Sequence, residues 1–221
     1  MISATAAGRS ASATVTVELV YDLDARGVPK LISHDYIELA TIARISRFRS
    51  GFGHDYSDDA ESCRSMKHYF QPRADVDWGA VAISSPVAGT IRTVRSEQTF
   101  GLQVQLTHND YPAITVILFH VRPDAELIPG SIVQAGQRLG THIGSQTMSD
   151  VAIRVDTPKG ARFVSYFDAM TDALFQTYSA RGVASRSAMI VTAAERDASP
   201  LSCMGEQFLD VGSLPNWVEL L

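Results

Sequence analysis

The residue types most able to do chemistry gather in one polar segment, from Ser50 to Asp77. This segment is dense in His, Asp, Cys, Lys and aromatic residues. It is too long to be a simple connection between two elements, and long irregular segments often carry function. Two kinds of chemistry fit these residue types: metal binding by His and Asp, and nucleophilic attack by Cys.

His54 and two nearby aspartates form the candidate metal-binding group. His54 and Asp58 are four positions apart, and side chains at positions i and i+4 of a strand share one face. That spacing would let both side chains hold one ion. His54 and Asp55 are sequence neighbours, so in a strand they would point to opposite faces. His68 is a candidate for an additional ligand.

Cys63 is the candidate nucleophile. A thiol needs a nearby base or positive charge to form the thiolate, and Arg, Lys and His residues follow Cys63 directly. Either His68 or His120 could serve as the base. The chain has one other cysteine, Cys203, so it permits at most one disulfide. A disulfide between the two would exclude this chemistry, and a single His or Cys is more often a packed or surface residue.

Beyond the polar segment the pattern changes to short strands separated by Gly, Pro, Asn and Asp. Six runs have strand character: 80–85, 90–94, 102–107, 114–119, 138–143 and 151–155. Strands at such close and even spacing predict an antiparallel sandwich or barrel. A helix is predicted over Phe167–Arg181, where apolar residues recur at helical spacing and Gly182 follows as a stop.

These patterns divide the chain into four parts. Residues 1–13 consist mainly of small residues that bury little surface, so we expect disorder. Residues 14–79 hold a strand at Thr14–Tyr21 and the polar insert, and residues 80–170 form the β core. Residues 171–221 form the helix and a tail that packs over the core. The predicted fold class is an all-β core with one C-terminal helix and irregular extensions.

The overall composition restricts the classes of partner and the location that we expect for this protein. The formal net charge of −5 argues against nucleic acid, whose binders usually carry a concentrated basic face, and Arg64, Lys67 and Arg73 are expected to be solvated charges. No apolar run approaches the ~18 residues that span a bilayer. The first 15 residues lack the basic start and apolar block of a signal peptide. Either the protein stays inside the cell, or a leader has been removed and the protein is secreted or periplasmic, which we favour.

Five segments of the core occur in an order that resembles a known family. They are Ser85–Ile91 (SPVAGTI), Leu102–Asn109, Ile114–Val121 with Phe119 beside His120, Ile128–Gly140 (IPGSIVQAGQRLG) and Asp156–Met170. Together they resemble the core of the lysostaphin-type (LytM-like) zinc endopeptidases. The resemblance implies a duplicated hybrid motif fold, an antiparallel β structure, over roughly 90 residues, a size usual for small domains. It also implies zinc as the cofactor and peptidoglycan or another peptide as the substrate.

Upstream of the core, the family's first metal motif, His-x-Gly-x-Asp-aromatic, has two possible registers. In one, Gly53, Asp55 and Tyr56 take the Gly, Asp and aromatic places, and Gly51 stands where the metal-binding His belongs. In the other, His54 and Asp58 restore the His-x-x-x-Asp spacing and the Gly is lost. Both registers remain open from the sequence.

The sequence departs from the family at the last histidine motif. Where the family has His-x-His, this chain has Asp150-Val151-Ala152. The resemblance would make His120 the acid/base or oxyanion residue, with Asp150 in the place of the histidine near the water. Ala152 has no ligand atom, although catalytic zinc takes three protein ligands. A missing ligand would have to come from His68, Cys63 or Asp150.

Three functions follow from these residues. The first is a metal-dependent hydrolase of cell-wall-type peptide bonds with a rearranged zinc site at His54, Asp58, Asp55 or His68. The second is a non-catalytic module of the same fold that binds cell-wall material or activates a wall hydrolase. The third is a thiol enzyme that uses Cys63.

Overall fold

The computed structural model describes residues 2–6, 9–13, 19–145 and 147–221. Within the segment for which disorder is predicted, β1 (Ile2–Ala6) and β2 (Arg9–Ala13) pair as an antiparallel two-stranded sheet of their own. The strand predicted at Thr14–Tyr21 falls mostly on residues 14–18, which lie outside the described residues. Leu19 and Val20, at its end, are exposed.

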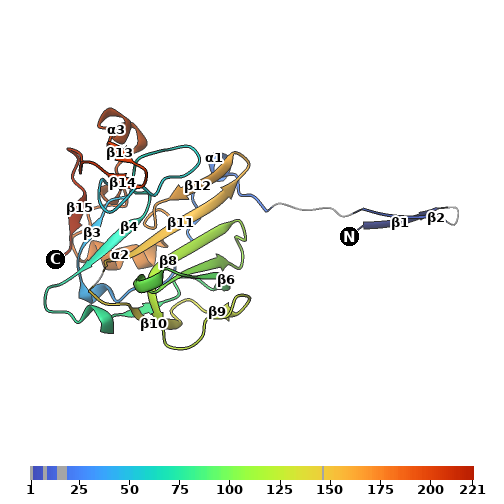
Figure 1. Cartoon of the computed structure of the whole chain (residues 1–221), viewed down its shortest axis with the longest axis horizontal. Helices are drawn as coiled ribbons and strands as arrows, with labels where there is room; N and C mark the ends of the chain where they lie inside the picture. The colour runs from blue at the N-terminus through green and yellow to red at the C-terminus, as the bar shows by residue number, and fades with distance from the viewer. Residues whose placement is uncertain (1, 7–8, 14–18, 146) are drawn as a thin grey trace.

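The body of the protein is an 11-stranded sheet in which the named strands pair antiparallel. The main path runs β15-β3-β4-β11-β8-β7-β6-β9, and β5, β10 and β12 join it from the side. Figure 1 shows β4, β11 and β8 next to one another in the sheet. The antiparallel β core predicted from the sequence is therefore confirmed.

All six predicted strands are present. The strands of the sheet are β3 (Ile42–Ser46), β4 (His68–Pro72), β5 (Ala82–Ser84), β6 (Gly89–Ser96), β7 (Leu102–His108), β8 (Ile114–Pro123), β9 (Ile132–Val133), β10 (Arg138–His142), β11 (Ser149–Thr157), β12 (Gly160–Val164) and β15 (Trp217–Glu219). Three of them, β3, β4 and β15, come from outside the predicted core of residues 80–170 and extend its sheet. The small hairpin of β13 (Cys203–Met204) and β14 (Gln207–Phe208) is separate.

Helices are few and short, namely α1 (Leu23–Arg26), α2 (Asp172–Ser179) and α3 (Ala193–Ala198), with 3-10 turns at η1 (Leu39–Thr41), η2 (Trp78–Ala80), η3 (Gln98–Phe100) and η4 (Ser187–Met189). The helix predicted over Phe167–Arg181 is α2, which begins later because the Thr171 side chain accepts the N–H of Leu174 as an N-cap. Among the described residues, no helix is long and apolar enough to cross a membrane.

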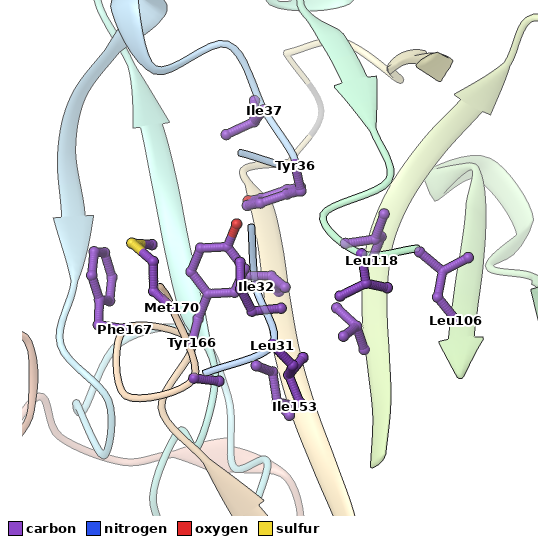
Figure 2. Close-up of a cluster of buried hydrophobic side chains, with 14 of the residues drawn as sticks. Leu31, Ile32, Tyr36, Ile37, Leu106, Leu118, Ile153, Tyr166, Phe167 and Met170 are labelled. Atoms are coloured by element: carbon purple, nitrogen blue, oxygen red, sulfur yellow. The ribbon is translucent and has the colours of Figure 1, made fainter. Parts of the chain in front are cut away.

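The central strand β8 is buried on both faces. Alternate residues such as Val116 and Leu118 face the main core, while Ile117 and Phe119 face a second cluster with Ala152. Figure 2 shows part of the main core, where loop residues lie against strand residues: Leu31, Ile32, Tyr36, Ile37, Leu106, Leu118, Ile153, Tyr166, Phe167 and Met170. The second cluster is covered by Tyr56 from the polar insert and by Phe163. The insert thus packs on the sheet where β8 ends.

Glycines shape the segment between β8 and β10 as its motif predicts. Gly130 and Gly136 have φ of 92° and 79°, the left-handed region that favours glycine, and both lie in turns. Gly140 serves close approach instead, because a Cβ there would lie 2.1 Å from the carbonyl oxygen of Arg122 in β8. These turns bring β10 back onto β8.

Candidate functional site

Three adjacent strands place three ionisable side chains at one point. Lys67 immediately precedes β4, His120 lies near the end of β8, and Asp150 lies at the start of β11. The register pairs Asp150 with Tyr69 across β11 and β4, and Val151 with Leu118 across β11 and β8. The sheet itself therefore sets the geometry of the site.

The charged groups form an alternating chain from the interior toward the surface. The Lys67 Nζ lies 2.5 Å from Asp150 Oδ2, and Asp150 Oδ1 lies 3.1 Å from His120 Nε2. On its other side, His120 Nδ1 lies 3.1 Å from Glu97 Oε2. The side chains of Lys67 and Asp150 are 3% and 0% exposed, and the pairing compensates the cost of burying their charges.

His120 is held in a strained backbone conformation. Its φ is 61°, in the left-handed region that costs a residue other than glycine about 1–3 kcal/mol. The backbone N–H of His120 donates to Glu97 Oε2 at 3.2 Å, so one carboxylate fixes both the backbone and the ring. The sequence offered no signal for this role of Glu97.

Protonation at the site follows from these neighbours. Burial acts against the charged imidazolium of His120, but hydrogen bonds and charge attraction from Asp150 and Glu97 prevail and raise its pKa to about 9. Burial acts to raise the pKa of Asp150, but Lys67 and His120 lower it overall. At neutral pH, His120 is therefore an imidazolium and Asp150 a carboxylate.

Lys67 also contacts His54 and three aromatic rings. The Nζ lies 3.1 Å from His54 Nε2. It also lies 4.8 Å, 4.9 Å and 4.3 Å from the ring centroids of Tyr56, Tyr69 and Phe119, as cation–π contacts. The expectation that Lys67 is a solvated charge is wrong. The neighbouring apolar residues Met66, Tyr69 and Phe70 were the sequence signal that Lys67 would be buried.

The metal pair predicted from His54 and Asp58 does not form. The segment from Gly51 to Ala60 consists of bends and irregular backbone, with an isolated bridge at Tyr56, so the shared strand face on which the prediction depended does not exist. The Asp58 carboxylate instead accepts backbone N–H groups of Ala60, Glu61 and Phe163, at 2.9, 3.1 and 2.9 Å. Its role is to fold the insert and fix it to β12.

Asp55 has a similar structural use. Its carboxylate accepts the backbone N–H groups of Cys63 and Arg64, at 3.2 and 3.1 Å, and the hydroxyl of Ser57. Gly53, from the first register, is required by the backbone: its φ is 81°, and a Cβ there would lie 2.1 Å from the Tyr69 hydroxyl. The insert thus uses Gly53 and Asp55 for its shape, while His54 reaches the site.

His68 faces away from the site, so its predicted role as a ligand is wrong. Neighbouring residues of a strand point to opposite faces, and Lys67 takes the face of the site. The His68 ring nitrogens lie 2.8 Å from the Ser46 carbonyl oxygen and 2.9 Å from Ser165 Oγ. Burial lowers the pKa of His68 to about 4. It is a neutral core histidine.

The predicted nucleophile Cys63 is wrong for a simple reason: its sulfur is bonded to Cys203. Among the described residues there is no free cysteine. The disulfide ties the insert to the C-terminal tail, where the N–H of Asp55 also donates to the Glu206 carbonyl at 2.7 Å. The thiol enzyme is thereby excluded.

A cavity of about 420 Å³ opens beside the charged chain. Its walls combine aromatic, apolar and polar residues: Phe52, Gly53, His54, Lys67, Tyr69, Phe100, His120, Thr147 and Met148. Phe52 packs edge-on against Tyr69 and against Trp217 from the tail. The cavity therefore has aromatic walls and a floor whose charges are paired.

The donor set does not fit the zinc that the sequence resemblance implies. The ammonium of Lys67 lies between Asp150 and His54, the two side chains that would have to hold an ion. Ala152 is 1% exposed and carries no donor atom. In the described part of the chain, no group of three or more His, Cys, Asp or Glu side chains is arranged to hold a metal.

Comparisons with known proteins give structural likenesses only. No family model matches the chain, and no curated protein matches it in sequence. The LytM protein of Ruminococcus gnavus ATCC 29149 has a TM-score of 0.37 and 15% identity, over 47% of this chain and 43% of that one. Lysostaphin has a TM-score of 0.33 and 16% identity, over 67% of this chain and 57% of that one.

The SpoIIQ–SpoIIIAH pore-forming complex supplies a third likeness, with a TM-score of 0.44 and 12% identity over 66% of this chain and 97% of that one. The chain thus spans about half the length of the LytM and lysostaphin structures that it matches. The resemblance to lysostaphin-type peptidases stated from the sequence is confirmed as structural similarity.

Proposed function

We propose that this chain is a peptide-binding module with a lysostaphin-type fold, acting on cell-wall peptide without hydrolysing it. The observation that carries the proposal is the cavity beside Lys67, with aromatic walls and a floor of mutually paired charges. Cavities of this size with mostly apolar walls and a few placed polar groups are typical of ligand sites.

The chemistry of the floor supports binding over hydrolysis. A general base must be free to accept a proton near neutral pH. His120 has a pKa raised to about 9, and both its ring nitrogens face carboxylates. It is therefore a charged donor that holds Asp150 and Glu97, unlike the base that a hydrolase of this type requires.

The aromatic walls would supply most of the binding energy. Phe100 is 45% exposed at the rim, and burial of apolar surface stabilises a complex by about 25 cal/mol per Å². Uncharged stretches of a wall peptide, small and apolar residues in extended conformation, match these walls. A ligand with a strong charge would find no unpaired counter-charge on the floor.

The disulfide supports a role outside the cytosol. Disulfides persist in oxidising compartments and are rare in the cytosol of most organisms. The bond between Cys63 and Cys203 fits a secreted or periplasmic protein, in contact with cell-wall material.

The test is calorimetric titration with soluble, uncharged wall-type peptides, namely oligoalanine and oligoglycine with both ends blocked. We expect binding that survives a chelator, and that weakens about 10-fold in Phe100→Ala, equivalent to about 1.4 kcal/mol. Ile132→Ala is the matched control, because Ile132 is also an exposed apolar side chain, 69% exposed, and lies outside the cavity. Equal affinity of the two variants, or no binding at all, would contradict the proposal.

The rearranged zinc hydrolase is tested in the same samples. Release of new amino groups from the peptides after zinc addition, lost in His54→Ala, would favour the hydrolase over the binding module. We expect no release above the rate without protein.

A further inference from the structure

The surroundings of the Lys67 ammonium resemble a cation site built from the chain itself. One carboxylate oxygen, Asp150 Oδ2, lies 2.5 Å from the Nζ, and one imidazole nitrogen, His54 Nε2, lies 3.1 Å from it. Three aromatic rings complete the surroundings. A carboxylate oxygen and a neutral imidazole nitrogen are also the groups that bind divalent metals.

The tautomer of His54 follows from its hydrogen bonds. Its Nδ1 lies 2.9 Å from the carbonyl oxygen of Asp55, which can only accept, so Nδ1 carries the proton. The lone pair of Nε2 is then directed at Lys67. A backbone carbonyl that fixes the far nitrogen of a histidine is the usual support for a metal-binding imidazole. Here that support orients the imidazole toward an ammonium.

The strand that carries Asp150 is adapted to the lysine as well. Ala152 is two residues further along β11, so its side chain lies on the same face. It packs with Phe119 and Tyr56, two of the rings that contact the ammonium. An apolar residue at this point suits the aliphatic stem of a buried lysine, whereas a histidine would compete with it.

From this arrangement we propose that Lys67 is a built-in cation which takes the place of a metal ion between His54 and Asp150, and that this one side chain excludes divalent metals from the site. The ammonium uses the lone pair of His54 and one oxygen of Asp150. A second cation placed within a few ångströms would meet direct repulsion in a poorly solvated environment.

The intact protein offers the first test, because the chain has only three lysines, Lys30, Lys67 and Lys159. In protein labelled with ¹⁵N-lysine, the buried Lys67 ammonium should give a slowly exchanging signal at neutral pH. We expect that signal to stay unchanged when zinc is added in excess, and to be lost in Asp150→Asn. Displacement of the signal by zinc in the unaltered protein would overturn the proposal.

The second test removes the cation. Zinc titration of Lys67→Ala should show affinity about 100-fold or more above that of the unaltered chain, since the charge that repels the ion is gone. The gain should disappear in Lys67→Ala/His54→Ala and increase in Lys67→Ala/Ala152→His, which adds a third ligand on the same face. Binding is measured by calorimetry and by elemental analysis after dialysis.

Lys159→Ala is the matched control. It removes the same charge from a side chain that is 71% exposed and pairs with Asp24 instead of Asp150. It should bind zinc no better than the unaltered protein. A gain in Lys159→Ala equal to that of Lys67→Ala would overturn the proposal, as would the absence of a gain in folded Lys67→Ala and in folded Lys67→Ala/Ala152→His. If Lys67→Ala does not fold, the ¹⁵N-lysine measurement decides alone. Loss of peptide binding in the cavity would leave these results unaffected, so the two proposals fail separately.

Discussion

His120 links the buried part of the site to its surface. Its ring lies between Asp150, which is fully buried, and Glu97, whose side chain is 21% exposed. The sequence named His120 and Asp150 as separate catalytic candidates through the resemblance alone. Their role in the structure is electrostatic, because Asp150 raises the pKa of His120 and His120 lowers that of Asp150.

The pKa of His120 should be measurable by NMR titration of the imidazole nitrogens. We expect about 9 in the unaltered protein and a clear fall in Asp150→Asn, where the main counter-charge is lost. Asp124→Asn, at a carboxylate that is 51% exposed and pairs with Arg138, should leave the His120 pKa where it was. Because the folded pKa lies above the unfolded value near 6.5, the stabilisation from His120 is complete below pH 6.5 and is lost toward pH 9. A pKa unchanged in Asp150→Asn would contradict this account.

His68 should give the opposite pH dependence. Its pKa is lowered to about 4 in the folded protein, so below pH 6.5 the unfolded chain binds the proton more readily. The free energy of unfolding should therefore fall by about 3 kcal/mol between pH 6.5 and pH 4 from this residue. Urea unfolding across that range measures the slope, and His68→Gln should reduce it. An identical slope in the variant would show that His68 is not responsible.

At the scale of elements, the site depends on how three strands align. β8 supplies an apolar run that is buried on both faces, and β10 is held against its end at Gly140. The alternation of side chains within β8 and β11 sends one set to the main core and the other toward the insert. His120 lies where that alternation breaks, because Phe119 faces the second cluster and Val121 faces the main core, with the positive φ of His120 between them.

Gly140→Ala should destabilise the protein by about 1–3 kcal/mol, because the new methyl group would overlap the Arg122 carbonyl oxygen at 2.1 Å. Gly79→Ala is the matched control, since the nearest atom to its Cβ is 3.5 Å away and its φ is not positive. Thermal and urea unfolding of both variants give the comparison. The close approach of β10 to β8 would be refuted by equal stability of the two.

At the scale of the whole molecule, the C-terminal tail holds the polar insert in place through covalent and hydrogen bonds. The disulfide joins positions separated by 140 residues, and Asn216 Oδ1 accepts the N–H of Gly51 at 2.8 Å. The tail also supplies β15, which pairs with β3 at one side of the sheet. The walls of the cavity at Phe52 and His54 are therefore held by a distant part of the chain.

Removal of the disulfide by Cys63→Ser/Cys203→Ser should lower the free energy of unfolding by about 3–5 kcal/mol, because a loop of this length gains much entropy in the unfolded state. Urea unfolding measures the loss, and the unaltered protein in reductant should match the variant. The reductant should have no effect on the variant itself. A loss below about 1 kcal/mol would contradict this role of the disulfide.

The sequence by itself determined the antiparallel β core, its six strands and the glycine turns between β8 and β10. These are local properties: alternation of apolar residues, and backbone angles that glycine adopts without strain. It also named His54, His120 and Asp150 as candidate site residues, through spacing and resemblance, and their function stays a prediction.

Only the tertiary structure decided what those residues do. Burial of Lys67, the partner of Cys63, the direction of His68 and the use of Asp58 all depend on contacts between distant segments. No local pattern encodes them, because a lysine costs free energy to bury until a carboxylate from another strand compensates its charge. Asp150 supplies that compensation in the structure, as an ion pair with Lys67.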